Sequence, residues 1–211
     1  MPVRPITPEA LVEELAEAIT ARPRDACIRV AIDGAPAARP DDLADRLAEP
    51  LRLRGRAVQR VSAADFLRPA SLRLEFGRTD PDVFHDEWLD AAALGREVLE
   101  PLAPGGSGAV LPALWDSAAD RAFRVPYRTL PPGGVLLLDG TLLLGRGLPF
   151  DLTVHLWLSP AALERRTPAE EHWRLPAYAR YERETGPENA ADVVIRADHP
   201  ARPALQTHDP G

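Results

Sequence analysis

The feature that most constrains the fold is a short apolar strand that runs directly into a glycine turn and then into a helix. Ala26 to Ile32 (ACIRVAI) is rich in β-branched residues, and Asp33-Gly34 ends this run. Residues 41–54 follow with leucines at helical spacing, and Gly55 ends that pattern. A short β-branched run of this kind is typical of a strand buried in a parallel sheet. The order of strand, turn and helix therefore predicts an α/β architecture.

The rest of the chain repeats this alternation. Thr7-Pro8 and Ser159-Pro160 each place a capping side chain before a proline at the first helical position, and Asp80-Pro81 does the same before a pattern that predicts one long helix reaching Ala91. The pattern predicts further strands at 58–63, 134–138, 152–158 and 192–196, and a further helix at 176–184. We therefore expect a doubly wound, mostly parallel sheet flanked by helices.

Length and composition indicate one compact unit. The chain has 211 residues, of which 45% are hydrophobic, which is enough to bury one substantial core. We expect a single domain over residues 1–200, with an N-terminal helix within 1–22 and a hairpin or excursion at 103–132. The Pro-rich residues 201–211 are expected to form a flexible tail.

Composition also excludes several functions. The net charge is −7 and the basic residues are scattered, so we expect no nucleic-acid binding. We expect neither a membrane span nor a targeting segment, and hence a cytoplasmic protein. A single cysteine excludes an internal disulfide and any multi-cysteine metal site. All 25 of the Lys+Arg residues are arginine, so any chemistry that requires a lysine is closed to this chain.

The segment from Ala31 to Leu47 (AIDGAPAARPDDLADRL) places a glycine turn at a helix N-terminus, where free N–H groups and the helix dipole attract anions. It resembles the first strand, phosphate-binding loop and first helix of bacterial uridine kinase-like proteins, whose loop has the form G-x-x-x-x-G-K-[ST]-[ST]-L-A. Gly34 and Leu43-Ala44 match that form. The resemblance continues in family order through Ser62 to Pro69, Asp80 to Phe84, Val135 to Gly140 and Tyr181 to Ile195. It implies a P-loop kinase fold.

Three loop positions depart from the family form. Arg39 stands where the second glycine is expected, Pro40 where the lysine is expected, and Asp41 where the magnesium-binding hydroxyl is expected. A side chain at the glycine position costs about 1 kcal/mol if the backbone there needs a positive φ. Proline removes both the ammonium and a backbone donor. A carboxylate of Asp41 or Asp42 about 4 Å from a phosphate costs about 4 kcal/mol at an effective dielectric near 20.

Three interpretations of the loop stay open. It is a well-capped helix start without a ligand, or a site for a different anion or nucleotide in another pose. Alternatively, Arg39 covers a phosphate or Asp41 holds a magnesium ion that bridges to it. In the family arrangement, the residues nearest a cofactor are Asp33, Gly34, Ala38, Arg39, Asp41 and Asp42. We predict no metal site made of protein ligands and no certain cofactor. ATP and Mg²⁺ are expected to bind only if the protein is an active kinase.

The resemblance also implies catalytic positions. In uridine kinases the aspartate of S-x-D-x-F is the base that takes the proton of the nucleoside 5′-hydroxyl. That position is Ala64 here, so the neighbouring Asp65 is the candidate base, with a turn or capping role as the alternative. Asp139 corresponds to the Walker B-like carboxylate. Arg165 and Arg166, and less directly Arg174, correspond to lid arginines, although exposed arginines on a helix are commonly just solvated.

The nucleoside-contacting region of the family corresponds to Asp80, Phe84 and His85. The simpler role of Asp80 is a helix N-cap, and the simpler role of Phe84 is a core position. Two functions follow. In the first, the chain is a uridine kinase-like protein with a degenerate loop that binds a nucleoside, a nucleotide or a protein partner, with phosphotransfer weak or lost. In the second, it is an active ATP-dependent kinase of a nucleoside or similar hydroxylated metabolite, with Arg39 and the lid arginines replacing the lysine.

Overall fold

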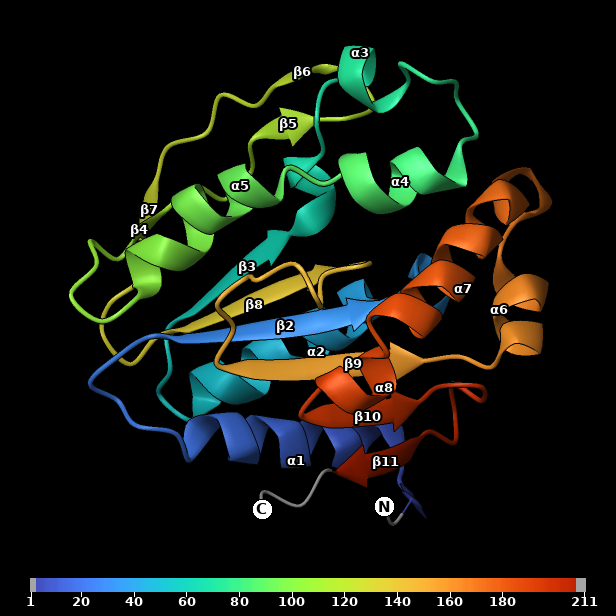
Figure 1. The fold of residues 1–211 in the computed structure, drawn as a ribbon. Coiled ribbons are helices and arrows are strands. Elements are labelled where there is room, and N and C mark those ends of the chain that lie inside the picture. Colours follow the sequence, from blue (N-terminus) through green and yellow to red (C-terminus); the bar gives the residue numbers. More distant parts are fainter. Residues whose placement is uncertain (1–2, 208–211) are drawn as a thin grey trace.

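A seven-stranded sheet organises the computed structural model, which describes residues 3–207 (Figure 1). Across the sheet, the strands lie in the order β1 (Val3–Pro5), β11 (Ala204–Thr207), β10 (Val193–Arg196), β9 (Leu152–Trp157), β2 (Ile28–Gly34), β8 (Val135–Gly140) and β3 (Val58–Ser62). The five strands from β10 to β3 are parallel, and β11 runs antiparallel to both of its neighbours. The mostly parallel, helix-flanked sheet expected from the sequence is confirmed.

Eight α-helices lie in the described chain: α1 (Pro8–Thr20), α2 (Pro40–Leu53), α3 (Ala70–Arg73), α4 (Pro81–Glu87), α5 (Ala91–Leu94), α6 (Pro160–Arg166), α7 (Leu175–Glu184) and α8 (Pro187–Ala190). Apolar side chains of α1 and α2 pack on one face of the sheet. The other face is covered in two parts, by the chain around α5 and by α4 with α7 (Figure 1). The core therefore lies on both faces of the sheet, as a doubly wound fold requires.

The predicted helix starts are confirmed where a side chain caps them. Thr7 accepts a hydrogen bond from the N–H of Ala10 at 3.2 Å, and Ser159 accepts one from Ala162 at 3.3 Å. The prediction of one long helix after Asp80 is wrong. Helix α4 ends at Glu87, because Asp90 caps a new helix, α5, by accepting from Ala93 N–H.

The C-terminal segment differs from expectation, whereas residues 103–132 form the kind of excursion that was predicted. Residues 204–207, predicted to belong to a flexible tail, form β11 and pair with β1 and β10, while residues 208–211 lie outside the described residues. The excursion at 103–132 contains two small antiparallel pairs, β4 (Ala109–Val110) with β7 (Arg128–Thr129) and β5 (Trp115–Asp116) with β6 (Arg121–Ala122). No helix within residues 3–207 is both long and apolar enough to cross a membrane.

Candidate functional site

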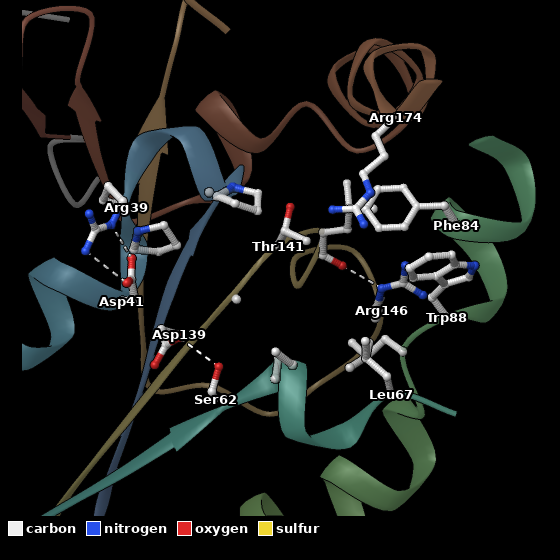
Figure 2. A pocket seen from close by; sticks show the side chains of 18 residues that line it. Arg39, Asp41, Ser62, Leu67, Phe84, Trp88, Asp139, Thr141, Arg146 and Arg174 are labelled. Carbon is white, nitrogen blue, oxygen red and sulfur yellow. Dashed lines mark hydrogen bonds and ion pairs between the residues drawn. The ribbon is translucent and has the colours of Figure 1, made fainter. Parts of the chain in front are cut away.

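A cavity of about 440 Å³ opens at the carboxyl ends of β2, β8 and β3 (Figure 2). Gly34, Asp139 and Ser62 reach it from these three strands. The start of α2 forms one wall, and side chains of α4 and the segment before α7 form another. In open parallel sheets this edge is where ligands bind, and the volume is in the range of small-molecule pockets.

The loop between β2 and α2 satisfies its own backbone. A 3₁₀ turn, Pro36–Ala38, uses the N–H of Ala38 to bond Ala35 O at 2.8 Å and the N–H of Arg39 to bond Pro36 O at 3.0 Å. Pro36 and Pro40 have no N–H to offer. Of the five positions from Pro36 to Pro40, two N–H donors are therefore used internally and two are absent, which leaves the N–H of Ala37 to face an anion.

Arg39 occupies a left-handed conformation with φ 60°, which is the region that favours glycine. Its guanidinium forms a two-point ion pair with Asp41, with Nε to Oδ1 at 3.0 Å and Nη2 to Oδ2 at 3.2 Å (Figure 2). Burial alone would raise the pKa of Asp41, but the hydrogen bond from Arg39 and the N–H of Asp42 lower it overall. The ion pair and the left-handed turn lie together at the N-terminus of α2.

The other predicted loop residues take different positions. Gly34 lines the cavity, and a Cβ there would approach Leu156 Cβ to 3.1 Å, so close strand packing also favours glycine at this position. Asp42 is exposed and lies, with Ala38, beside a separate hollow between α1 and α2. Asp33 does not line the main cavity but is fully buried below it.

Asp139 lies on the cavity floor at the end of β8 and is only 4% exposed. Arg60 Nη2 bonds its Oδ1 at 2.6 Å, and Ser62 Oγ donates to its Oδ2 at 3.0 Å. The charge of this carboxylate is therefore already compensated by β3. Buried carboxylates need such partners, because desolvation of an unpaired charge is costly.

Ala64, the position of the family base, lines the cavity, whereas its neighbour Asp65 does not. Both belong to the 3₁₀ turn Ala63–Phe66 that follows β3. Burial raises the pKa of Asp65, and the carboxylates of Asp139 and Asp116 raise it further. The structure thus places the methyl group of Ala64 on the cavity wall, whereas Asp65 does not line the cavity.

An aromatic wall closes the far side of the cavity. Phe84 makes edge contacts with Trp88, Trp173 and Tyr178 at centroid distances of 5.1, 5.6 and 5.9 Å. The guanidinium of Arg174 lies over the rings of Phe84, Trp88 and Trp173 at 5.1, 5.5 and 5.1 Å. Aromatic rings packed edge to face, with a cation over them, form a rigid surface for a planar ligand.

Two residues predicted to contact a substrate have mainly structural contacts. Asp80 caps α4 by accepting from the N–H groups of Asp82 and Val83 at 2.9 and 3.0 Å. His85 is not among the residues that line the cavity, and its Nδ1 lies 2.6 Å from Asp86 Oδ1. Of the three predicted substrate residues, Phe84 is the one that the structure places on the cavity wall.

The predicted lid arginines separate. Arg165 is exposed on α6 and bonds Ala161 O of its own helix at 3.3 Å. Arg166 donates to Ala197 O at 2.9 Å and to Asp198 O, and it lines two other hollows of the surface rather than the cavity that contains Asp139. Only Arg174 reaches the main cavity.

Within residues 3–207, six buried side-chain polar atoms have no hydrogen-bond partner. Two belong to cavity-lining residues, Thr141 Oγ1 and Arg174 Nε, and two more are Tyr178 Oη and His85 Nε2, whose rings contact the aromatic wall or the residues behind it. Burial raises the pKa of Tyr178 to about 12, so its hydroxyl stays protonated. Native proteins rarely leave such atoms unpaired unless a ligand or water completes them.

No family model and no curated protein matches the sequence. Among solved structures, a possible uridine kinase from Bacillus stearothermophilus aligns with a TM-score of 0.71 and 19% identity, over 87% of this chain and 96% of that chain. A candidate fructose transport system kinase from Silicibacter sp. TM1040 aligns with a TM-score of 0.56 and 22% identity, over 93% and 96%. The protein has the P-loop kinase fold.

The fold implied by the sequence resemblance is therefore confirmed, at identities that show the fold alone. Sequence reasoning missed four residues of the site: Thr141, Arg146, Trp88 and Tyr178. Three of them follow a recognised motif by a few positions, since Thr141 and Arg146 come after the LLLDG strand and Trp88 after Asp80-Pro81. Within a P-loop kinase fold, residues that follow a strand at its carboxyl end are candidates for ligand contact.

Below the cavity, a buried network anchors the chain that follows β8. Asp33 accepts from Leu143 N–H at 2.9 Å, from Tyr181 Oη at 3.1 Å, and lies 2.7 Å from His155 Nδ1. Tyr181 Oη in turn accepts from Leu144 N–H at 2.9 Å. This network, rather than a cofactor contact, explains the position of Asp33 in the structure, and it makes His155 structural as its place in a strand suggests.

Tyr181→Phe is expected to lower the free energy of unfolding by about 1–3 kcal/mol, because the buried N–H of Leu144 and the carboxylate of Asp33 both lose a partner. Urea denaturation with an unchanged m-value measures this loss. Tyr178→Phe is the matched control on the same helix, since its buried hydroxyl lies near the Thr141 side chain but bonds neither a backbone N–H nor a carboxylate, and we expect a smaller loss of at most about 1 kcal/mol. Equal losses in the two variants would contradict the network.

Proposed function

We propose that the protein binds a nucleoside-like small molecule in the main cavity and that its phosphoryl transfer from ATP is lost or very weak. The observation that carries the proposal is the contrast between the two halves of the site. The loop at α2 uses the N–H groups of Ala38 and Arg39 internally and pairs the charge of Arg39 with Asp41, whereas the aromatic half keeps a cavity bordered by polar atoms without hydrogen-bond partners among the described residues.

The loop does not fit a triphosphate with Mg²⁺. Opening the exposed ion pair of Arg39 and Asp41 costs little, because solvent screens both charges. The freed carboxylate of Asp41 would then face the phosphates, at a cost of about 4 kcal/mol for charges 4 Å apart at an effective dielectric near 20. A penalty of that size weakens binding by several hundred-fold.

Two catalytic groups are also replaced. Phosphoryl transfer in P-loop proteins depends on a lysine at the β- and γ-phosphates. All 25 of the Lys+Arg residues in this chain are arginine, so that lysine is missing. The position of the base is occupied by Ala64 at the cavity wall. These differences support a degenerate Walker A loop and a pseudokinase-like binding protein. The proposal also includes a small-molecule ligand and a cytoplasmic location.

The aromatic half supports the choice of ligand. A planar base can lie against Phe84 and Trp88, and the hydroxyls of Ser62 and Thr141 offer hydrogen bonds to a sugar or ring substituent. A protein partner, the alternative expectation from the sequence, has less support, because the unpaired polar atoms border a concave cavity.

Thermal unfolding with a panel of nucleosides, and separately with ATP and Mg²⁺, tests the proposal. A ligand at 100 times its Kd stabilises the folded protein by about 2.7 kcal/mol, so a matching nucleoside is expected to raise Tm by several degrees, and ATP with Mg²⁺ to leave it unchanged. An ATP-dependent rise accompanied by phosphorylation of a nucleoside would instead establish the active kinase.

Thr141→Val locates the binding. Removing the Thr141 hydroxyl, which lies at the cavity near the Tyr178 hydroxyl, should cost at most about 1 kcal/mol of stability but weaken nucleoside binding by about 10-fold, the loss of one hydrogen bond. Thr20→Val is the matched control on α1, where the hydroxyl donates to Ala16 O far from the cavity. Loss of binding in the Thr20 variant, or none in the Thr141 variant, would place the ligand elsewhere.

A further inference from the structure

Arg146 brings a positive charge to the cavity that no carboxylate of the described residues pairs at short range. The residue follows β8 by six positions and lines the cavity beside Trp88 (Figure 2). Its Nε donates to Leu142 O at 2.6 Å and its Nη2 donates to His85 O, both of them neutral carbonyls. No ion pair to Arg146 is present within residues 3–207, and its Nη1 has no hydrogen bond there.

The carboxylates near the cavity are already paired with other cations. Asp41 is held by Arg39, and Asp139 by Arg60. Behind the aromatic wall, Asp86 pairs with Arg180 at 2.8 Å. Burial lowers the pKa of Arg146, and the more distant Tyr181 and Asp86 oppose this only in part. The guanidinium is therefore short of negative charge.

Arg174 adds a second cation on the same side of the cavity. Its guanidinium stacks on three aromatic rings, and its buried Nε has no acceptor among the described residues. One carboxylate bonds it, Glu171 Oε2 to Nη1 at 3.2 Å. In Figure 2, Arg146 and Arg174 lie on either side of the Phe84 and Trp88 rings.

The backbone beside Arg146 is held in an unusual conformation. Leu142, whose carbonyl accepts from Arg146 Nε, is 3% exposed and has φ 58°. A bulky residue in the left-handed region is a genuine outlier, and such strain persists where surrounding contacts enforce it, commonly at ligand sites. The strained turn fixes Arg146 in place and so pre-organises its free donor.

We propose that the ligand of this cavity is an anion, namely a planar ring that carries one carboxylate or phosphate group bound by Arg146 and Arg174. The inference rests on the proposed function, because it names the ligand class of that same cavity. A neutral ring would cover Arg146 without supplying a counter-charge, whereas an anion forms charge-assisted hydrogen bonds to the free donors. The charge of the ligand is thus recognised at the aromatic wall, away from the closed loop of α2.

Matched ligand pairs test this inference by titration calorimetry. Uracil-6-carboxylate is compared with uracil-6-carboxamide, and uridine 5′-monophosphate with uridine, in the same low-salt buffer. We expect the anion of at least one pair to bind 10-fold or more tightly than its neutral partner, since each charge-assisted bond contributes more than a neutral one. The pair that shows the preference tells whether the group is a carboxylate or a phosphate.

Arg146→Met is expected to remove that preference, by weakening the anion at least 10-fold and leaving the neutral ring within about 3-fold. Arg146→Lys, which keeps the charge, should retain part of the preference and covers the case in which the methionine variant fails to fold. Arg183→Met is the control, since Arg183 is exposed on α7 and bonds only its own helix at Ala179 O.

The outcomes separate the two proposals. If neutral rings bind as tightly as anions, the anionic ligand is ruled out while the binding function stands. If no ring of either kind binds, the proposed function itself fails. A preference that survives in Arg146→Met would assign the anion to another group and overturn the role of Arg146.

Discussion

A variant that carries R39G, P40K, D41S and D42T is expected to bind ATP with Mg²⁺ at least about 100-fold more tightly than the natural protein. The four changes rewrite the loop as G-K-S-T between Gly34 and Leu43. They remove two carboxylates, each of which costs up to about 4 kcal/mol near a phosphate, and they supply the missing ammonium. Glycine also suits the φ of 60° at position 39.

Calorimetric titration with ATP and Mg²⁺ measures this gain. R39G alone is the control, because it relieves the left-handed strain and breaks the pair with Asp41 but leaves both carboxylates and Pro40. We expect R39G to be as stable as the natural protein or up to about 1 kcal/mol more stable, and still unable to bind ATP. Tight ATP binding by the natural protein would show that the loop opens and that our interpretation of it is wrong.

Arg60→Met is expected to lower the free energy of unfolding by about 3–5 kcal/mol, because it leaves Asp139 as a buried carboxylate without its ion pair. The 4% exposure of Asp139 gives water little access to compensate. Chemical denaturation measures the loss. Adding D139N to the variant should restore part of the stability, since a neutral amide carries a smaller desolvation cost than a lone charge.

The second partner of Arg60 supplies the control. Asp45 also pairs with Arg60 but its side chain is 76% exposed, so Asp45→Asn should cost at most about 1 kcal/mol. If Arg60→Met costs no more than Asp45→Asn, then the charge of Asp139 is compensated by other means. The comparison separates a buried pair from an exposed pair that shares the same guanidinium.

Much of the fold was predictable because its signals are local. The capping side chains of Thr7, Asp80 and Ser159 bond to N–H groups two or three residues away, so a short window of sequence contains the whole interaction. The buried strands β2 and β8 can likewise be recognised from their short, mainly apolar runs. These elements set the cavity edge, and for this reason the position of Gly34 and Asp139 at that edge followed from sequence.

The rest depends on contacts between distant parts of the chain. Arg146 gains its place from His85 and Leu142, and β11 exists because β1 and β10 offer it partners. The three residues of β1 and the four of β11, which lie in Pro-rich parts of the chain, carry too little pattern to be recognised alone. The internal use of Ala38 and Arg39 N–H groups also depends on a turn geometry that the letters A-P-A-A-R do not specify by themselves.

The pairing of β1 with β11 decides how the molecule responds to a pull on its two ends. Val3 is opposite Gln206 and Pro5 is opposite Ala204, so the outer ends of both strands meet at one corner of the sheet. Tension applied there opens the ladder one hydrogen bond at a time instead of shearing it as a block. The mechanically weakest part is therefore the pairing of β1 with β11 at the edge of the sheet. The parallel strands beneath the cavity bear load only after these two strands have separated.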